Sequence, residues 1–299
     1  MTSDKIAILM SSQIVEQHKR APSAFAFMAR AFLPSPGLAR DGAIPSILQK
    51  WEGLRIEADH LAAFHRASGL AEGDGVSVLY PHVLGFRLQM ALLTHRAYPL
   101  PIWNALQIRN RLTRHRQFHA GERLDLETRV GAHRFVDKGI EIDLRSRLMR
   151  ESECCWESEV TYFYRGRFGS AAVEASAEAP RLSQAPVVER FRMPRGGGWH
   201  FGSLTGDYNG IHWANWYARR LGFRAAFPHP QRVAGMCMAR LRGPASAAQT
   251  LQLWIKGPVF YGAEAVLNAA PIDQGVQFGL SLDGDQRAAL LGQWQATPS

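Results

Sequence analysis

FGSLTGDYNGIH, at residues 201–212, brings a carboxylate and an imidazole together in one short segment. Asp207 and His212 stand five positions apart, and Gly206, Asn209 and Gly210 surround them. These two side-chain types commonly transfer protons near neutral pH. The glycines permit tight turns that would aim both groups into one pocket. The same spacing also arises by chance, with the Asp as a helix cap and the His on the surface, so a second element has to support it.

That second element follows about two dozen residues later. Val233-Ala234-Gly235-Met236 leads into the helix-like run CMARL. The pattern G-D-x-N-x-x-H followed by Gly-Met resembles the motif of MaoC-like (R)-specific enoyl-CoA hydratases and dehydratases, which have hotdog folds. The resemblance is most specific over residues 199–241 and weaker over both halves of the chain. The chain departs from the family where Gly210 replaces a proline and Ala234 replaces a usual histidine.

The resemblance implies a hydro-lyase that adds water reversibly to trans-2-enoyl thioesters and gives (R)-3-hydroxyacyl thioesters. Asp207 and His212 would bind the water between them. Which of the two acts as base and which as acid stays open, because coupled groups titrate as a unit. Gly235, expected at the start of a helix, would give its N–H to the thioester oxygen, since the first N–H groups of a helix lack internal partners. Asn209 would fix the loop or cap the helix near His212. The remaining second-shell or substrate-binding residues expected around this pair are Gly206 and Tyr208.

Two halves of the chain repeat one pattern of a helix followed by strands. Segments 107–112, 123–130, 139–149 and 156–164 alternate or are β-branched, which is typical of antiparallel strands. The stretch after Pro81 parallels the stretch after Pro230, with Gly85 opposite Gly235. The first copy has HRASGLAEGD where the second has the Asp-His pair. An α+β double hotdog is therefore expected, in which two helix-wrapped antiparallel sheets pair into one continuous sheet and the second half carries the chemistry.

Three units are expected along the chain. Residues 1–50 form an N-terminal helical extension, with helix over residues 5–33. Residues 51–180 form a first hotdog unit without the pair, and residues 181–299 form the second, catalytic unit. The segment 166–196 is rich in Ala, Ser, Glu and Pro and reads as a linker.

The composition of the chain limits which classes of partner and ligand are expected. The chain has 299 residues, a net charge of +9 and three cysteines. The positive charge is scattered and no Lys/Arg-rich block occurs, so nucleic acid is not expected as a partner. No metal is expected because no Cys/His cluster with ligand spacing appears. A cytoplasmic protein without a membrane span and without a cofactor is expected, with coenzyme A or an acyl carrier protein as part of the substrate. A homodimer is possible.

Four arginines are candidates for phosphate contacts or for a solvated strand face: Arg109, Arg111, Arg114 and Arg116.

Two alternatives stay open from the sequence. The chain could be a non-catalytic hotdog protein that binds acyl thioesters, since Gly210 and Ala234 depart from the family pattern. It could also be an acyl-CoA thioesterase on the same fold.

Overall fold

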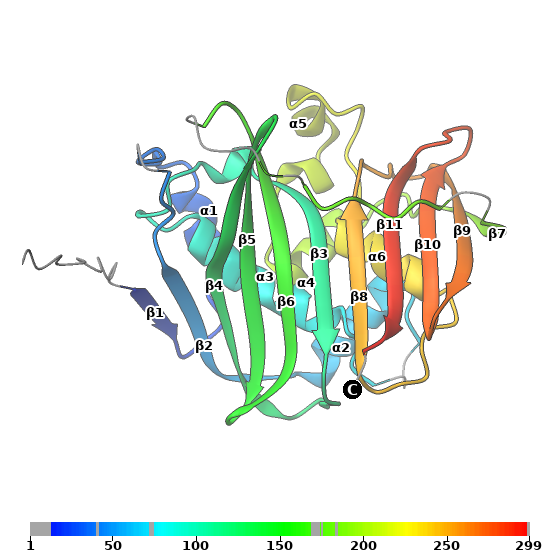
Figure 1. The fold of residues 1–299 in the computed structure, drawn as a ribbon, viewed down its shortest axis with the longest axis horizontal. Helices are drawn as coiled ribbons and strands as arrows, with labels where there is room; N and C mark the ends of the chain where they lie inside the picture. Colours follow the sequence, from blue (N-terminus) through cyan, green and yellow to red (C-terminus); the bar gives the residue numbers. More distant parts are fainter. Residues whose placement is uncertain are drawn as a thin grey trace, which may run out of the picture.

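One eleven-stranded sheet organises the chain in the computed structural model, which describes residues 13–39, 42–71, 75–168, 174, 176–182 and 185–297. The helices lie together behind this sheet (Figure 1). The strands run in the order β1-β2-β4-β5-β6-β3-β8-β11-β10-β9-β7. The sheet therefore divides naturally at β3 and β8, one strand from each half of the chain.

The first half wraps five strands around one helix. Its central helix α3 (Tyr80–Leu93) is buried along nearly its whole length, which fits its run of apolar residues. It packs against β2, β4 and β5. Its elements are β2 (Ile47–Arg55), α2 (Ala58–Ser68), α3, the 3-10 turn η1 (Ile102–Asn104), β3 (Leu106–Arg114), β4 (Arg123–Val136), β5 (Gly139–Arg150) and β6 (Glu153–Arg165).

The second half repeats this topology. In each half one strand, β2 or β7, precedes the helices, and four strands follow them. The first of these four strands, β3 or β8, lies at the centre of the whole sheet. Its elements are β7 (Val187–Arg192), α4 (Gly198–Thr205), the 3-10 turn η2 (Gly210–His212), α5 (Asn215–Arg220), α6 (Pro230–Met238), β8 (Gln249–Ile255), β9 (Glu264–Ile272), β10 (Gly275–Leu282) and β11 (Ala288–Ala296). The predicted internal duplication is thus visible in the strand order.

The two halves meet at an antiparallel seam between β3 and β8. Leu112 lies opposite Leu251, and the hydroxyl groups of Thr113 and Thr250 lie 3.2 Å apart. Side chains of both halves also share one hydrophobic core, in which Leu79 of the first half and Val233 of the second are both buried. The seam is therefore continuous in backbone hydrogen bonds and in packing.

A buried ionic cluster lies on the first half of the sheet. Glu141 and Asp143 alternate along β5 with Ile140 and Ile142, so they face the opposite side of the sheet from the apolar core. Arg134 lies 2.6 Å from Glu141 and 2.8 Å from Asp143. Both carboxylates are nearly inaccessible to solvent, and Arg134 bridges them while Arg109 lies 3.7 Å from Glu141.

Two expectations about local structure are wrong. Residues Ile14–His18 form a strand, β1, which pairs in parallel with β2, instead of helix. Only α1 (Ala24–Arg30), capped by the hydroxyl of Ser23, is helical in this region, and residues 1–12 lie outside the described part. The expected linker contains β7, an edge strand that is exposed except at Phe191 and that pairs, within the described ranges, with β9 alone. Its exposure explains why its sequence, VVERFR, lacks the alternation of a half-buried strand. The division into units at residues 50 and 180 stays a prediction, although residue 50 falls inside β2.

Candidate active site

Asp207 is held by a tight turn at the end of α4. The helix ends at Gly206, whose φ of 84° is in the left-handed region that favours glycine. The Thr205 hydroxyl accepts the N–H of Asp207 at 2.9 Å, and the N–H of Asn209 donates to Asp207 Oδ1 at 3.1 Å. Asp207 Oδ2 is thereby left to face the interior.

His212 is oriented by the turn that follows. The Asn209 side chain accepts the N–H of Ile211 and caps η2, as expected for this residue. His212 Nδ1 lies 3.0 Å from the carbonyl oxygen of Phe227, to which it donates. Its Nε2 therefore carries the lone pair and points at Asp207 Oδ2, 3.6 Å away. The structure thus brings the two predicted residues together.

A third side chain, His229, completes this cluster and was not predicted. Its ring stacks on that of His212 with 3.8 Å between centroids. Its Nε2 lies 3.0 Å from the backbone oxygen of Asp207 and 3.7 Å from Oδ2. His229 immediately precedes Pro230, the first residue of α6, and a residue before a helix-starting proline is a helix boundary. That signal could have placed His229 at a helix start, but not beside Asp207.

Burial sets the protonation of the cluster. Desolvation lowers the pKa of His212 and holds that of His229 well below its usual value. Desolvation also raises the pKa of Asp207, against the opposing influence of His212. Both imidazoles are therefore neutral at pH 7, and His212 Nε2 is able to accept a proton.

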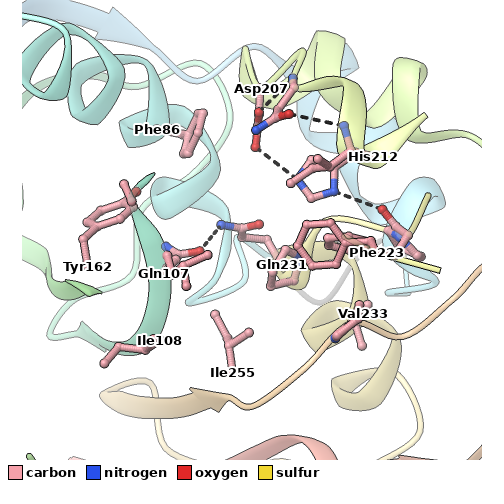
Figure 2. Close-up of a pocket in the computed structure, with 18 of the residues that line it drawn as sticks. Phe86, Gln107, Ile108, Tyr162, Asp207, His212, Phe223, Gln231, Val233 and Ile255 are labelled. Carbon is pink, nitrogen blue, oxygen red and sulfur yellow. Dashed lines mark hydrogen bonds and ion pairs between the residues drawn. The ribbon is translucent and has the colours of Figure 1, made fainter. Parts of the chain in front are cut away.

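Asp207 and His212 form the polar end of a cavity of about 410 Å³ (Figure 2). Away from them the walls are apolar and come from α1, α3 and η1 of the first half, for example Met28, Phe86 and Met90. From α6 the cavity is lined by Pro230, Gln231 and Val233. The shape and chemistry of this cavity suit a hydrocarbon chain with one reactive polar end.

Gly235 and Tyr208 lie away from this cavity. The prediction that Gly235 begins the helix is wrong, because α6 begins at Pro230 and Gly235 is its sixth residue. Inside the helix its N–H serves the helical hydrogen-bond ladder. A Cβ on Gly235 would lie 2.7 Å from Ser68 Cβ, so the glycine allows α2 and α6 to approach closely. The Tyr208 ring packs between Phe25 and Trp199.

Gly235→Ala is therefore expected to lower the free energy of unfolding by about 1–3 kcal/mol, the usual cost of overpacking. Urea denaturation would measure it. Gly196→Ala is the matched control, since a Cβ at Gly196 meets nothing within 4 Å. Equal stability of the two variants would contradict the packing role of Gly235.

The first turn of α6 has one N–H group without a backbone partner in the part of the chain that is described. Pro230 has no N–H, and the N–H groups of Arg232 and Val233 both point to the His229 carbonyl. Within the described residues the Gln231 N–H has no backbone partner. It is the first N–H at this helix end, where the helix dipole favours negative charge.

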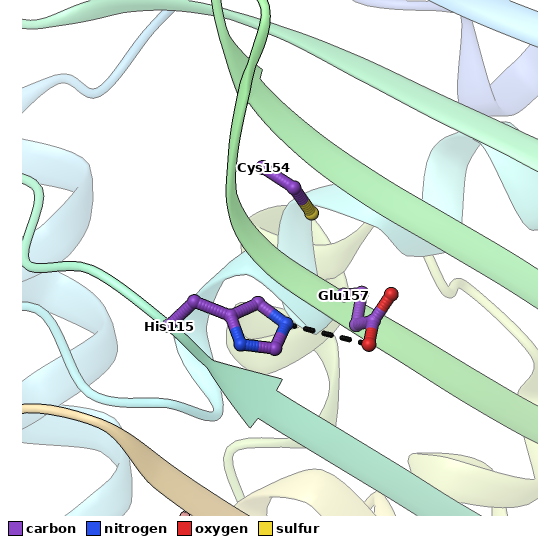
Figure 3. Close-up of side chains that lie close together, drawn as sticks. All are labelled: His115, Cys154 and Glu157. Carbon is purple, nitrogen blue, oxygen red and sulfur yellow. Dashed lines mark ion pairs between the residues drawn. The ribbon is translucent and has the colours of Figure 1, made fainter. Parts of the chain in front are cut away.

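In the part of the chain that the structure describes, two clusters of side chains have residue types that can bind a metal. Asp207, His212 and His229 form one, but stacked imidazoles cannot both direct an in-plane lone pair at one ion. His115, Cys154 and Glu157 form the other, away from the cavity (Figure 3). There His115 pairs with Glu157 at 3.3 Å, and burial raises the pKa of the Cys154 thiol, which donates to a backbone carbonyl. The absence of a metal stays a prediction.

The arginines considered for phosphate contacts have structural partners in three of four cases. Arg109 lies 3.7 Å from Glu141, and Arg116 pairs with Glu153 at 2.9 Å. Arg114 is buried and donates to the carbonyls of Val76 and Ala247. Arg111 is exposed on β3. The cation at the rim of the cavity is instead Lys256, which is exposed.

No helix among the described residues is both long and apolar enough to cross a bilayer.

Known proteins resemble the chain along most of its length, although no protein-family model matches it. 3-Hydroxyacyl-thioester dehydratase X of Mycobacterium tuberculosis is 23% identical over 240 residues, which cover 80% of this chain and 86% of that protein. The crystal structure of this protein, HtdX, superposes with a TM-score of 0.71 and 21% identity, covering 84% of this chain and 100% of that one.

Two further solved structures share the fold. The MaoC-like dehydratase from Phytophthora capsici superposes with a TM-score of 0.70 and 16% identity over 88% of this chain and 98% of that one. A Mycobacterium tuberculosis protein described as a double hotdog superposes with a TM-score of 0.54 and 14% identity over 88% and 98%. The predicted α+β double hotdog fold and the predicted resemblance to MaoC-like dehydratases are both confirmed by these relatives.

Proposed function

We propose that this protein is a hydro-lyase that interconverts trans-2-enoyl thioesters and (R)-3-hydroxyacyl thioesters. The observation that carries the proposal is the meeting of Asp207 Oδ2 and His212 Nε2, 3.6 Å apart, at the polar end of an apolar cavity. The dehydratase named among the relatives supports the same reaction class.

The two side chains divide the proton transfers of hydration. His212 Nε2, held neutral by burial, takes a proton from the water whose oxygen bonds to C3. Asp207, whose pKa burial raises, delivers a proton to C2, where the electron pair of the double bond arrives. Dehydration runs the same steps backwards, with Asp207 removing the C2 proton and His212 protonating the leaving hydroxyl.

The start of α6 stabilises the thioester oxygen. Negative charge builds on this oxygen while C3 is attacked, and a preorganised N–H aimed at it contributes about 3–4 kcal/mol. The Gln231 N–H stands at the helix end beside the cavity. It takes the role expected of Gly235.

The cavity determines the orientation of the bound substrate. The acyl chain follows the apolar wall toward Met90 and Leu93, and exposed Lys256 at the rim meets the phosphate of the thioester carrier, either coenzyme A or an acyl carrier protein. The homodimer, the cytoplasmic location and the absence of a cofactor stay predictions from the sequence.

A panel of enoyl-CoA thioesters of increasing length, starting with crotonyl-CoA, tests the reaction. Loss of the absorbance of the conjugated thioester is expected for at least one length. Release of free thiol without hydration would show a thioesterase. Saturable binding without turnover of any member would show the non-catalytic alternative.

The pH dependence follows from His212. Because its pKa is lowered, kcat/KM for hydration is expected to rise with pH with a midpoint below 6.5, as the imidazole becomes neutral. It is expected to fall again as Asp207, whose pKa burial raises, loses the proton that it delivers to C2. A midpoint of the rise above 6.5 would contradict His212 as the base. The rates have to be compared with circular dichroism at each pH, since the buried histidines bind protons below pH 6.5 more readily in the unfolded chain than in the folded one. His82, whose pKa burial lowers to about 4, and His229 contribute to that loss of stability as the pH falls.

A further inference from the structure

The side chain of Gln231 is held by two residues from the other half of the chain. Its Nε2 lies 3.1 Å from His82 Nε2 and 3.1 Å from Gln107 Oε1. An amide nitrogen has two hydrogens, so these two acceptors use both of them. The orientation of the amide is therefore set, with Nε2 toward α3 and β3 and Oε1 turned away from them.

The residues that hold Gln231 are themselves buried. His82 is 0% exposed, and burial lowers its pKa and keeps it neutral. Its Nε2 is the nitrogen that accepts, because the Gln231 amide nitrogen facing it can only donate. With Nε2 accepting, His82 Nδ1 carries the hydrogen, so the Gln89 Nε2 placed 3.5 Å from it makes no hydrogen bond to it. The buried polar network that fixes the Gln231 amide therefore consists of His82 on α3 and Gln107 on β3. Such networks are rigid when their members are paired.

Gln231 Oε1 is the end of the network that meets the cavity. Gln231 is 5% exposed and lines the cavity, and its oxygen has no hydrogen-bond partner among the described residues. In Figure 2 its amide lies beneath Asp207 and His212, with the nitrogen toward Gln107 and the oxygen on the side of His212. The oxygen is not one of the fully buried polar atoms that lack a partner, so it is open to the cavity, where a water or a ligand can donate a hydrogen bond to it.

We propose that Gln231 Oε1 accepts a hydrogen bond from the C3 hydroxyl of the 3-hydroxyacyl thioester, the oxygen that enters as water during hydration. This inference rests on the proposed hydro-lyase function. The thioester oxygen is no partner for Oε1, because both are acceptors. The enoyl substrate has no donor at C3, whereas the hydroxyacyl substrate and the attacking water have one. Gln231 is therefore the third side chain that holds the reacting oxygen, beside Asp207 and His212.

The first half of the chain, which lacks an Asp-His pair, takes part in catalysis through this network. His82 and Gln107 are positioning residues, since they act on the substrate only through Gln231. The two halves thus meet in one site, with the reactive groups in the second half and the fixed amide braced by the first.

The test compares both reaction directions in Gln231→Met, which keeps the length of the side chain and removes its polar atoms. Losing a hydrogen bond worth about 1.4 kcal/mol changes a binding or rate constant tenfold. KM for the 3-hydroxyacyl thioester is expected to rise about tenfold with kcat for dehydration nearly unchanged. KM for the enoyl thioester is expected to stay within about twofold while kcat for hydration falls about tenfold. In both directions kcat/KM thus falls about tenfold. The two falls are equal because a substitution in the enzyme cannot change the equilibrium constant of the reaction.

Two further variants sharpen the comparison. Gln231→Glu, neutral when its buried carboxyl is protonated, keeps an acceptor and is expected to retain the KM for the hydroxyacyl thioester within about threefold. Gln277→Met, on β10 and not among the residues that line the cavity, is the matched control and is expected to behave as the original protein. Gln231→Ser, too short to reach His82, replaces Gln231→Met if that variant does not fold by circular dichroism.

An unchanged KM for the hydroxyacyl thioester, or equal changes of KM for both substrates, would overturn the inference. Failure of the original protein to convert any enoyl thioester is a different result, because it removes the proposed function itself.

Discussion

Asp207→Asn and His212→Ala are each expected to lower kcat for enoyl-thioester hydration by about 10²–10⁴-fold, the usual contribution of a positioned acid or base. Asparagine keeps the shape of the aspartate and its contact with the Asn209 N–H, but it cannot deliver a proton. Alanine at 212 removes the lone pair that faces Asp207. KM is expected to change little, since the cavity wall that holds the acyl chain remains.

Steady-state rates of the purified variants with the best enoyl-CoA substrate measure this effect. Asp283→Asn and His200→Ala are matched controls, because both residues are exposed and neither lines the cavity. Undiminished turnover in either site variant would show that the pair is structural.

Arg134→Met has the largest effect expected on stability. It removes the guanidinium that bridges Glu141 and Asp143, whose side chains are only 2% and 3% accessible, and leaves Arg109, 3.7 Å from Glu141, as the nearby cation. Leaving buried carboxylates without their partner typically costs about 3–5 kcal/mol. Urea denaturation at pH 7 is expected to show a loss of this size.

An exposed pair provides the contrast. Arg145 lies 2.8 Å from Glu159, and both side chains are well exposed. Arg145→Met is expected to cost only about 0–1 kcal/mol, as is usual for surface pairs. Adding Glu141→Gln and Asp143→Asn to Arg134→Met is expected to recover part of the loss. Equal costs for the two arginines would contradict the account of the buried cluster.

Repetition made the sheet predictable. The strands around 107–112, 123–130, 139–149 and 156–164 follow from alternation, and all four are present as β3 to β6. Alternation requires one buried and one exposed face, so it could not reveal β7, an edge strand in which only Phe191 is buried. Nor could it reveal β1, whose pairing with β2 depends on contacts distant in the sequence.

The site was predictable where its residues are close in sequence. Asp207, Asn209 and His212 belong to one loop, so their convergence follows from local turns. His229 and Gln231 reach the same place only because α6 packs behind that loop, and His82 comes from the other half of the chain. Gly235 was misplaced because its pairing with Met236 resembles a helix start, whereas Pro230 fixes the actual one.

The seam between β3 and β8 determines what would happen if the chain were cut between its halves. Each fragment would present a long, unpaired strand edge with its hydrogen-bonding groups open to any other strand. Fragments produced together should recombine through that edge, and fragments produced alone should self-associate. Because the two halves belong to one chain, the edge of β8 is always available to pair with the edge of β3.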